Sequence, residues 1–367
     1  MSGTPKRQGA EPPQRCLIQL SAPGSGGVRD HLECLRTEWA AAGLASHVVT
    51  LSESDASQRS LAERLREIID AEGRPCAVIL HFSGYGFHPR GLCLWLVREV
   101  EAARQQLGER LHLVTMFHEL YASGPPWGSA FWLSPVQAWI ARRLACLSDA
   151  LWTNTELHGR WLRKQVGPAT PITIQPVFSN VGEPEALMPA EERALRLVVF
   201  GSTSTRRRAL AALPRHAESL IRQGITEILE VGSGEASPWS ASGLTLHFLG
   251  RMDKHDLRAL LERSAYGVVE YPPKYLGKSS VFAAYAAHGC VSLNVAPAAD
   301  DSDGLQAGVH FVSLSGAASL PQDAQARESV ARAARSWYDG HSLARQAVGF
   351  SASCAVQTMH RHDGARS

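Results

Sequence analysis

The stretch CLIQL at residues 16–20, followed directly by SAPGSGG at residues 21–27, decides the fold of this chain. A short apolar run that ends in a glycine-rich turn predicts a buried β-strand that leads into a tight turn. Apolar residues then recur at helical spacing from Val28 to Ala42, and a second apolar run covers residues 47–51. Strand, turn, helix and strand in this order predict a βαβ unit.

The same alternation continues along most of the chain. We expect helices near residues 61–70 and 92–104, and further strands at 77–81, 111–116, 150–153 and 172–174. Strands are expected again at 195–200, 228–231, 244–249, 266–270 and 290–294, and a last helical region at 324–346. This alternation predicts an α/β protein whose parallel sheets are covered by helices on both faces.

The predicted organisation is two Rossmann-like, doubly wound domains that face each other across a cleft. The first domain covers residues 16–180 and the second covers residues 195–346, with a linker at 181–194 between them. Polar segments at 1–15 and 347–367 are predicted to be tails. Because ligands of open α/β sheets bind outside the carboxyl ends of the strands, the loops that follow the strands are where we expect a site.

Composition restricts the function. The 367 residues, 44% hydrophobic and 20% charged, are typical of a folded chain with more than one core. A formal net charge of +2 gives no broad basic face, so we expect no nucleic-acid partner. The seven cysteines form no Cys-x-x-Cys pair and indicate buried thiols in a reducing compartment. Because no apolar segment reaches signal-peptide or membrane-spanning length, we expect a cytoplasmic location, with contact to the inner face of a membrane as a further hypothesis.

Candidate site residues in the first domain follow two predicted strands. Gly26-Gly27 opens the first helix, where a bare backbone can approach a ligand; a turn shaped only by steric fit is the alternative. His118 and Glu119 close a strand, and His118 is expected in the cleft, where it can bond a substrate hydroxyl. A structural histidine is the alternative, and Glu119 should point the other way. His81 is a weaker candidate of the same kind.

In the second domain, two cationic segments follow strands. Arg206-Arg207-Arg208 predicts either a clamp on a diphosphate or the solvated face of a helix. The strongest local signal is Lys278-Ser279-Ser280, directly before an alanine-rich helix over residues 281–288. The N–H groups and positive dipole end of such a helix favour phosphate, and Lys278 adds a cation there. A helix that is merely well capped is the alternative, although it would not need the lysine.

An aromatic segment follows His118 and precedes two arginines: Trp127, Phe131, Trp132, Trp139, Arg142 and Arg143. Aromatic and cationic residues together suit a membrane headgroup layer or a lipid-linked acceptor, and an amphipathic helix packed on its own domain is the alternative. The chain shows no convincing metal-ligand spacing and no Asp-x-Asp triplet. We therefore expect no metal and no cofactor, and a metal-independent reaction.

Taken together, these residues resemble the large retaining glycosyltransferase family of the GT-B fold called family 4 or group 1. The resemblance runs from Cys16 to Asn294 but is specific at few points. It includes Gly26-Gly27 after the first strand, the pair His118-Glu119, Gly201 with the cationic Arg207 six residues later, and Gly250 in a Phe-x-Gly turn. The resemblance implies that His118 lies by the donor sugar and that the second domain binds the nucleotide-sugar.

The chain departs from the family at its donor signature. Ser202 stands where the family has arginine, and the two family glutamates fall on Leu276 and Ala284. Lys278, Ser279 and Ser280 occupy that neighbourhood instead. The resemblance implies transfer of a sugar from a UDP- or GDP-sugar to a saccharide, which we expect to be lipid-linked and part of a surface polysaccharide. A nucleotide-sugar epimerase and a catalytically silent nucleotide-sugar-binding subunit stay open as alternatives.

Overall fold

The structure is a computed structural model that describes residues 16–24, 26–299, 303–315 and 320–355. The predicted N-terminal tail, and the predicted C-terminal tail from residue 356 on, lie outside these described residues. The chain forms two compact units. Of the described residues, the first unit contains those from 16 to 151, 165–171 and 347–355. The second unit contains those within 152–164 and 172–346.

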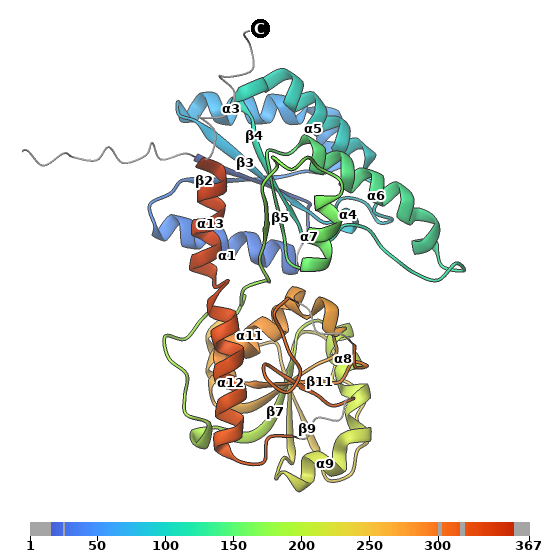
Figure 1. Cartoon of the computed structure of the whole chain (residues 1–367), viewed down its shortest axis with the longest axis vertical. Helices are drawn as coiled ribbons and strands as arrows, with labels where there is room; N and C mark the ends of the chain where they lie inside the picture. The colour runs from blue at the N-terminus through green and yellow to red at the C-terminus, as the bar shows by residue number, and fades with distance from the viewer. Residues whose placement is uncertain (1–15, 25, 300–302, 316–319, 356–367) are drawn as a thin grey trace, which may run out of the picture. The chain divides into compact units, whose positions relative to one another are not determined.

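The first sheet has the order β2-β1-β3-β4-β5-β6, and β1 runs parallel to both β2 and β3 (Figure 1). Its strands are β1 (Cys16–Ser21), β2 (Ser46–Thr50), β3 (Cys76–Phe82), β4 (His112–Phe117), β5 (Ala150–Thr153) and β6 (Ile172–Ile174). Every residue of β1, β3 and β4 is buried, which explains their continuous apolar sequences. The predicted strand, turn, helix and strand at residues 16–51 are confirmed.

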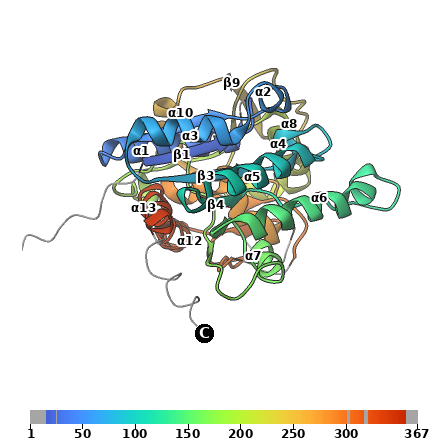
Figure 2. The ribbon, with the colours of Figure 1, turned by 90° about the horizontal axis from the view of Figure 1, so that it is seen from above.

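Helices cover this sheet and lie between its strands in the sequence. They are α1 (Gly27–Ala41), α2 (Glu53–Gln58), α3 (Leu61–Glu72), α4 (Gly84–Phe87), α5 (Leu94–Leu107), α6 (Ser129–Leu147) and α7 (Glu156–Arg163). The capping box of Ser60 and Glu63 marks the start of α3. Figure 2 shows α6 reaching outward beyond the strands, which leaves its amino-terminal part uncovered.

The second sheet has the order β12-β11-β10-β7-β8-β9 with parallel pairing throughout. Its strands are β7 (Ala194–Phe200), β8 (Glu227–Val231), β9 (Thr245–Gly250), β10 (Ser264–Val269), β11 (Val291–Asn294) and β12 (Val312–Ser313). The helices are α8 (Thr203–Ala212), α9 (Ala217–Arg222), α10 (Lys254–Glu262), α11 (Ser280–His288) and α12 (Ala324–Asp339). Two six-stranded α/β sheets therefore confirm the predicted fold class.

Helix α11 is buried from Val281 to His288, and its alanines allow close packing on the sheet. Tyr285 lies against Gly267 of β10, where an added Cβ would stand 2.3 Å from the tyrosine ring. The Tyr285 hydroxyl donates to the carbonyl oxygen of Val198 at 2.8 Å. This packing fixes the amino end of α11 relative to the strand ends of its own sheet.

The C-terminal part of the chain differs from the prediction. Residues 347–355, predicted as tail, form the end of helix α13 (Leu343–Ala355) and belong to the first unit. The indole of Trp39 donates to the carbonyl oxygen of Ala347 at 3.0 Å, and His112 pairs with the carbonyl oxygen of Ser353 at 2.9 Å. Apolar residues such as Phe350 bury this helix, so the segment is a structural part of the unit.

Candidate functional site

The glycine-rich turn after β1 borders a hollow of about 150 Å³ in the first unit. An added Cβ at Gly24, Gly26 or Gly27 would meet no heavy atom within 4 Å. Gly26 is the N-cap of α1 and has a φ of 133°, which a residue with a side chain rarely adopts. His81 and Ser83 line the same hollow. The predicted Gly26-Gly27 turn thus offers open backbone to a ligand beside a histidine.

Three histidines from different elements gather in this unit: His31 of α1, His81 of β3 and His118 after β4. All three are buried, and each offers a ring nitrogen within 4.8 Å of the others. His81 Nδ1 lies 3.2 Å from His118 Nε2, and His81 Nε2 lies 3.0 Å from Gln19 Oε1. The members of this cluster are at least 37 residues apart in the chain, so no local sequence pattern revealed it.

The environment of His31 and His81 favours their neutral forms. Burial lowers the pKa of His81 to about 3. Burial and the neighbouring His81 hold the pKa of His31 well below its usual range. The ring of His31 meets that of His118 edge-on at 5.0 Å between centroids. His31 and His81 are therefore neutral near pH 7.

Glu119 does not join the histidine cluster. Its side chain is exposed and accepts a hydrogen bond from the Ser83 hydroxyl at 3.0 Å. His118, by contrast, is only 8% exposed. The opposite orientation expected for two neighbours on an extended backbone is therefore observed.

In the second unit, the amino ends of α8 and α11 lie side by side. An added Cβ at Gly201, before α8, would be 3.4 Å from Val281 Cγ2 of α11. Ser202 caps α8 by accepting a hydrogen bond from Thr205 N at 3.3 Å, and Ser279 caps α11 through Phe282 N at 3.2 Å. The structure thus brings Gly201, Ser202, Ser279 and Ser280 together. The positive ends of two helix dipoles lie together there, and this arrangement favours the binding of an anion.

The three consecutive arginines of α8 have three different environments. Arg206 is fully buried, pairs with Glu230 and donates to the carbonyl oxygen of Gly201 at 2.7 Å. Arg208 pairs with Glu270 at 2.8 Å. Arg207 is about half exposed and lies 3.8 Å from the exposed Glu235. The predicted three-arginine clamp is wrong as a unit, because Arg206 is buried in an ion pair, whereas Arg207 and Arg208 are both exposed.

Lys278 precedes the Ser279 cap of α11 and is half-buried. Its Nζ lies 5.7 Å from the centre of the Tyr275 ring. Burial and the charge of Lys278 together lower the pKa of His158 to about 3. Gly250 lies elsewhere at the strand ends, where its carbonyl oxygen accepts from Gly232 N at 2.9 Å. A cation therefore lies next to a helix amino end, as predicted.

Aromatic side chains are exposed on and before α6. Trp127 is 87% exposed and Trp132 is 69% exposed, and Phe131 and Trp139 are also exposed. Arg142 is exposed as well, whereas Arg143 pairs with Glu101. Helix α6 nevertheless buries Ile140, Ala141 and Leu144 in its own unit, so the amphipathic helix given as the alternative is observed, and contact of the exposed face with a membrane stays a prediction. Among the described residues, no helix is both long and apolar enough to cross a membrane.

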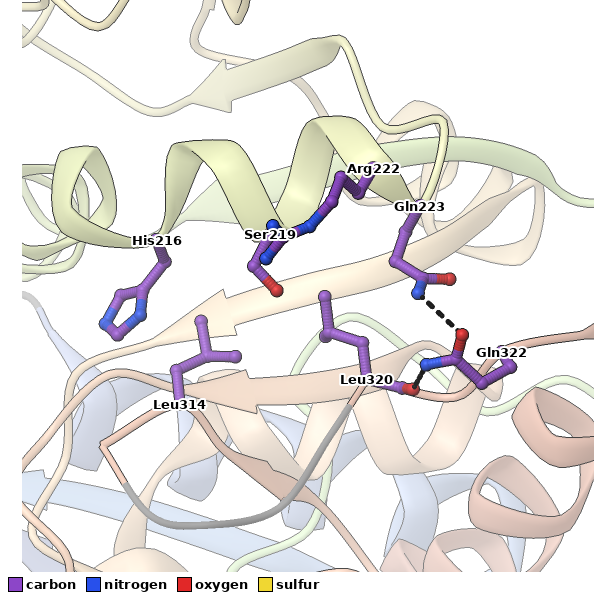
Figure 3. Close-up of a pocket in the computed structure, with 7 residues that line it drawn as sticks. All are labelled: His216, Ser219, Arg222, Gln223, Leu314, Leu320 and Gln322. Atoms are coloured by element: carbon purple, nitrogen blue, oxygen red, sulfur yellow. Dashed lines mark hydrogen bonds between the residues drawn. The ribbon is translucent and has the colours of Figure 1, made fainter.

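A larger pocket of about 500 Å³ lies in the second unit, between α9 and the chain after β12 (Figure 3). Gln223 donates to Gln322 across it at 3.1 Å, and Arg222 and His216 also line it. It contains none of the residues that the sequence singled out. We assign it no function.

Comparison with solved structures identifies the architecture. The Rickettsia africae glycosyltransferase aligns over 94% of this chain and 100% of its own, with 10% identity and a TM-score of 0.57. HepE of Anabaena, solved with UDP and glucose, aligns over 92% and 100%, with 14% identity and a TM-score of 0.56. This chain has the GT-B fold.

A third GT-B structure shows the same likeness over nearly the full length. The UDP-forming α,α-trehalose-phosphate synthase of Burkholderia vietnamiensis aligns over 94% of this chain and 98% of its own, with 12% identity and a TM-score of 0.55. No protein-family model and no curated protein matches the sequence. At such low identity the likeness establishes the GT-B fold, and the chemistry must come from the residues themselves.

Proposed function

We propose that this chain is a glycosyltransferase that moves a sugar from a UDP- or GDP-sugar to a saccharide acceptor. The observation that carries the proposal is the pair of helix amino ends, α8 and α11, joined at Gly201 and Val281 with Lys278 beside them. A nucleotide-sugar donor presents a diphosphate, which is the anion that such a site favours. Two of the GT-B structures described above carry UDP in their names, which makes uridine the first nucleotide to test.

The chemistry expected at this site is electrostatic. When the bond between sugar and diphosphate breaks, negative charge grows on the departing diphosphate. Lys278, Arg207 and the first-turn amides near Ser279 and Ser280 stabilise that charge more in the transition state than in the ground state. Gly201, Ser202 and Gly250 let the donor approach the backbone. Because these cations are protein side chains, the reaction proceeds without a divalent metal.

The first unit supplies the groups for the sugar and the acceptor in this proposal. Gly26 and Gly27 leave backbone open beside the hollow, and His118 orients a hydroxyl of the donor sugar or the acceptor. The exposed aromatic residues of α6 suit an acceptor held in a lipid headgroup layer. The substrate class is then a lipid-linked saccharide of surface polysaccharide synthesis, made at the inner face of a membrane.

A specific observation also favours a second candidate, a nucleotide-sugar-binding subunit without catalytic activity. Leu276 and Ala284, which stand where the resembled family has glutamates, are both fully buried and apolar. Neither offers a carboxylate to the donor. Such a subunit would bind the donor but transfer nothing, whereas an epimerase would convert the donor with no acceptor present.

The first experiment is a thermal-shift screen with UDP, GDP and their sugars, followed by product analysis with and without saccharide acceptors. A ligand that binds only the folded state raises the melting temperature. Lys278→Ala is expected to weaken binding and lower kcat/KM by about 30-fold or more, because one charge-assisted contact contributes roughly 2–4 kcal/mol.

Lys274→Ala is the matched control, since Lys274 contacts the same Tyr275 ring at 5.3 Å but is exposed and lies further from the helix cap. Equal effects of the two substitutions would contradict the diphosphate site. A turnover rate abolished by a chelator would contradict the metal-independent step. Binding without transfer would favour the silent subunit.

A further inference from the structure

Gln19 is a buried amide in the middle of a strand that is otherwise built for a hydrophobic core. It lies on β1 between Ile18 and Leu20 and is 0% exposed. Its Nε2 makes no hydrogen bond among the described residues. Burying an amide costs free energy that only well-placed partners recover. Among the described residues, the side-chain partner of Gln19 is the ring of His81, whose Nε2 lies 3.0 Å from Gln19 Oε1. This hydrogen bond is therefore important for the burial of Gln19.

The ring of His81 connects Gln19 to His118. Its Nδ1 lies 3.2 Å from His118 Nε2, the two ring centres are 5.5 Å apart, and the ring planes differ by only 22°. Two rings that lie almost in one plane, edge to edge, have the geometry of a hydrogen bond in which one nitrogen donates and the other accepts. His31 and Phe350 pack around His81 and restrict its rotation.

The direction of these bonds follows from elementary chemistry. An amide oxygen can only accept, so His81 Nε2 carries a proton and donates it to Gln19 Oε1. Because burial keeps His81 neutral near pH 7, its ring has only that one N–H, and Nδ1 must accept. The bond between the histidines then requires a proton on His118 Nε2.

We propose that Gln19 and His81 are positioning residues that hold the ring of His118 and keep a proton on its Nε2, so that His118 meets a substrate hydroxyl in one fixed orientation. The tautomer assignment stands on the first unit alone. Its use on a sugar or acceptor hydroxyl rests on the proposed glycosyl transfer.

A shared metal ion is the competing account of the three histidines. Zinc bound by three histidines needs ring nitrogens whose lone pairs converge on one point. His81 Nδ1 and His118 Nε2 instead point at each other. A metal would also remove the proton that the hydrogen bond between them requires, so the two accounts exclude each other and one experiment separates them.

The test is the tautomeric state of His118 and His81 in the full-length protein, measured by two-dimensional ¹⁵N–¹H NMR of the imidazole rings with ¹⁵N-histidine labelling. His118→Gln and His81→Asn assign the signals. The expected result is the Nε2–H tautomer for both rings near pH 7. An Nδ1–H tautomer of either ring, or a stoichiometric transition metal that is lost on substituting His81, would overturn the proposal.

Two substitutions of His81 separate positioning from mere packing. The side-chain oxygen of His81→Asn can still accept from His118 Nε2–H, whereas His81→Leu removes the acceptor. We expect His118 to keep its tautomer in the Asn variant and to become a mixture of tautomers in the Leu variant. If the Leu variant leaves the His118 signals unchanged, the proposal fails. If that variant does not fold, the tautomers in the wild-type spectrum decide whether the proposal holds.

Activity gives a second readout once a donor is known. Loss of one neutral hydrogen bond in the transition state should lower kcat/KM about five- to tenfold in His81→Leu, with recovery in His81→Asn. His112→Leu is the control, because His112 is an equally buried histidine of the same sheet that bonds to a backbone carbonyl. If NMR shows the expected tautomers but no donor is turned over, the proposed function fails and the tautomer assignment survives.

Discussion

Arg206 and Glu230 form an ion pair in which both side chains are completely buried, with Nε and Oε1 2.9 Å apart. The pair joins helix α8 to strand β8. Arg206 also donates to the carbonyl oxygens of Gly201 and Ser233, and Glu230 accepts from the Ser237 hydroxyl at 2.5 Å. The loops at the carboxyl ends of β7 and β8 are thus held by one satisfied polar network.

Substituting Arg206 should damage the fold of the second unit. Arg206→Ala leaves a buried carboxylate without its cation, and the free energy of unfolding is expected to fall by about 3–5 kcal/mol. Chemical denaturation measures this loss. The control is Arg222→Ala, since Arg222 pairs with Glu218 on the exposed surface, and its loss should leave stability nearly unchanged. Equal stability of the two variants would contradict a structural role for the buried pair.

A substitution at Gly27 tests whether the hollow after β1 accepts a ligand. Gly27 begins helix α1, and an added Cβ would meet no atom within 4 Å. Gly27→Ala should therefore keep or slightly raise the melting temperature, because alanine favours a helix by roughly 0.5–1 kcal/mol over glycine. If a substrate approaches this backbone, kcat/KM should nevertheless fall severalfold. Unchanged kcat/KM in the folded variant would remove Gly27 from the site.

Much of the fold could be predicted because its strands are buried on both faces. Such strands show continuous apolar runs in the sequence, and the predicted strand at 77–81 matches β3 at Cys76–Phe82. Residues 347–355 of helix α13 were predicted as tail because Gly349, Ser351 and Ser353 interrupt their apolar pattern. What buries it is contact with distant residues such as Trp39, and no local pattern reports such a contact.

The candidate site was only partly predictable for a related reason. Lys278 and the cap of α11 are neighbours in the sequence, so local reasoning found them. Gln19 and His81 are 62 residues apart, and their pairing depends on the order of strands in the sheet. A signal was present, since Gln19 is the one polar residue within the run at 16–20. The arginines of α8 were misjudged as a unit because consecutive helical residues point in different directions.

Asp149 should make the stability of the first unit depend on pH. Burial acts to raise the pKa of Asp149, but hydrogen bonds from Arg104 and from Leu113 N outweigh it and hold the pKa below its usual value. The stabilisation is present above the unfolded-state pKa, near 4, and is lost as pH falls through the lower folded-state pKa.

Asp149→Asn is therefore expected to lower the free energy of unfolding by about 2–3 kcal/mol at pH 7, and by much less near pH 2. Denaturation at the two pH values measures the difference. Asp70→Asn serves as the control, because Asp70 pairs with Arg110 at an exposed position and should show little effect at either pH. A loss for Asp149→Asn that is the same at both pH values would show that the carboxylate charge is not its source.

The exposed aromatic residues before and on α6 predict binding to lipid surfaces. The segment from Tyr121 to Ser148 contains no acidic residue, carries Arg142 and Arg143, and exposes Trp127 and Trp132. Tryptophan favours the headgroup layer, and the arginines favour anionic lipids. Co-sedimentation with phosphatidylglycerol-containing vesicles is therefore expected, with weaker binding at high salt. Trp127→Ser and Trp132→Ser should each weaken it about tenfold, since burying such a ring contributes on the order of 1.5 kcal/mol.

Val348→Ser is the matched control for this surface, because Val348 is an equally exposed apolar residue of the same unit on α13. It should bind vesicles like the wild type. If all three variants bind equally, the aromatic segment does not face a membrane, and an acceptor free in solution becomes the better substrate class for the proposed transfer.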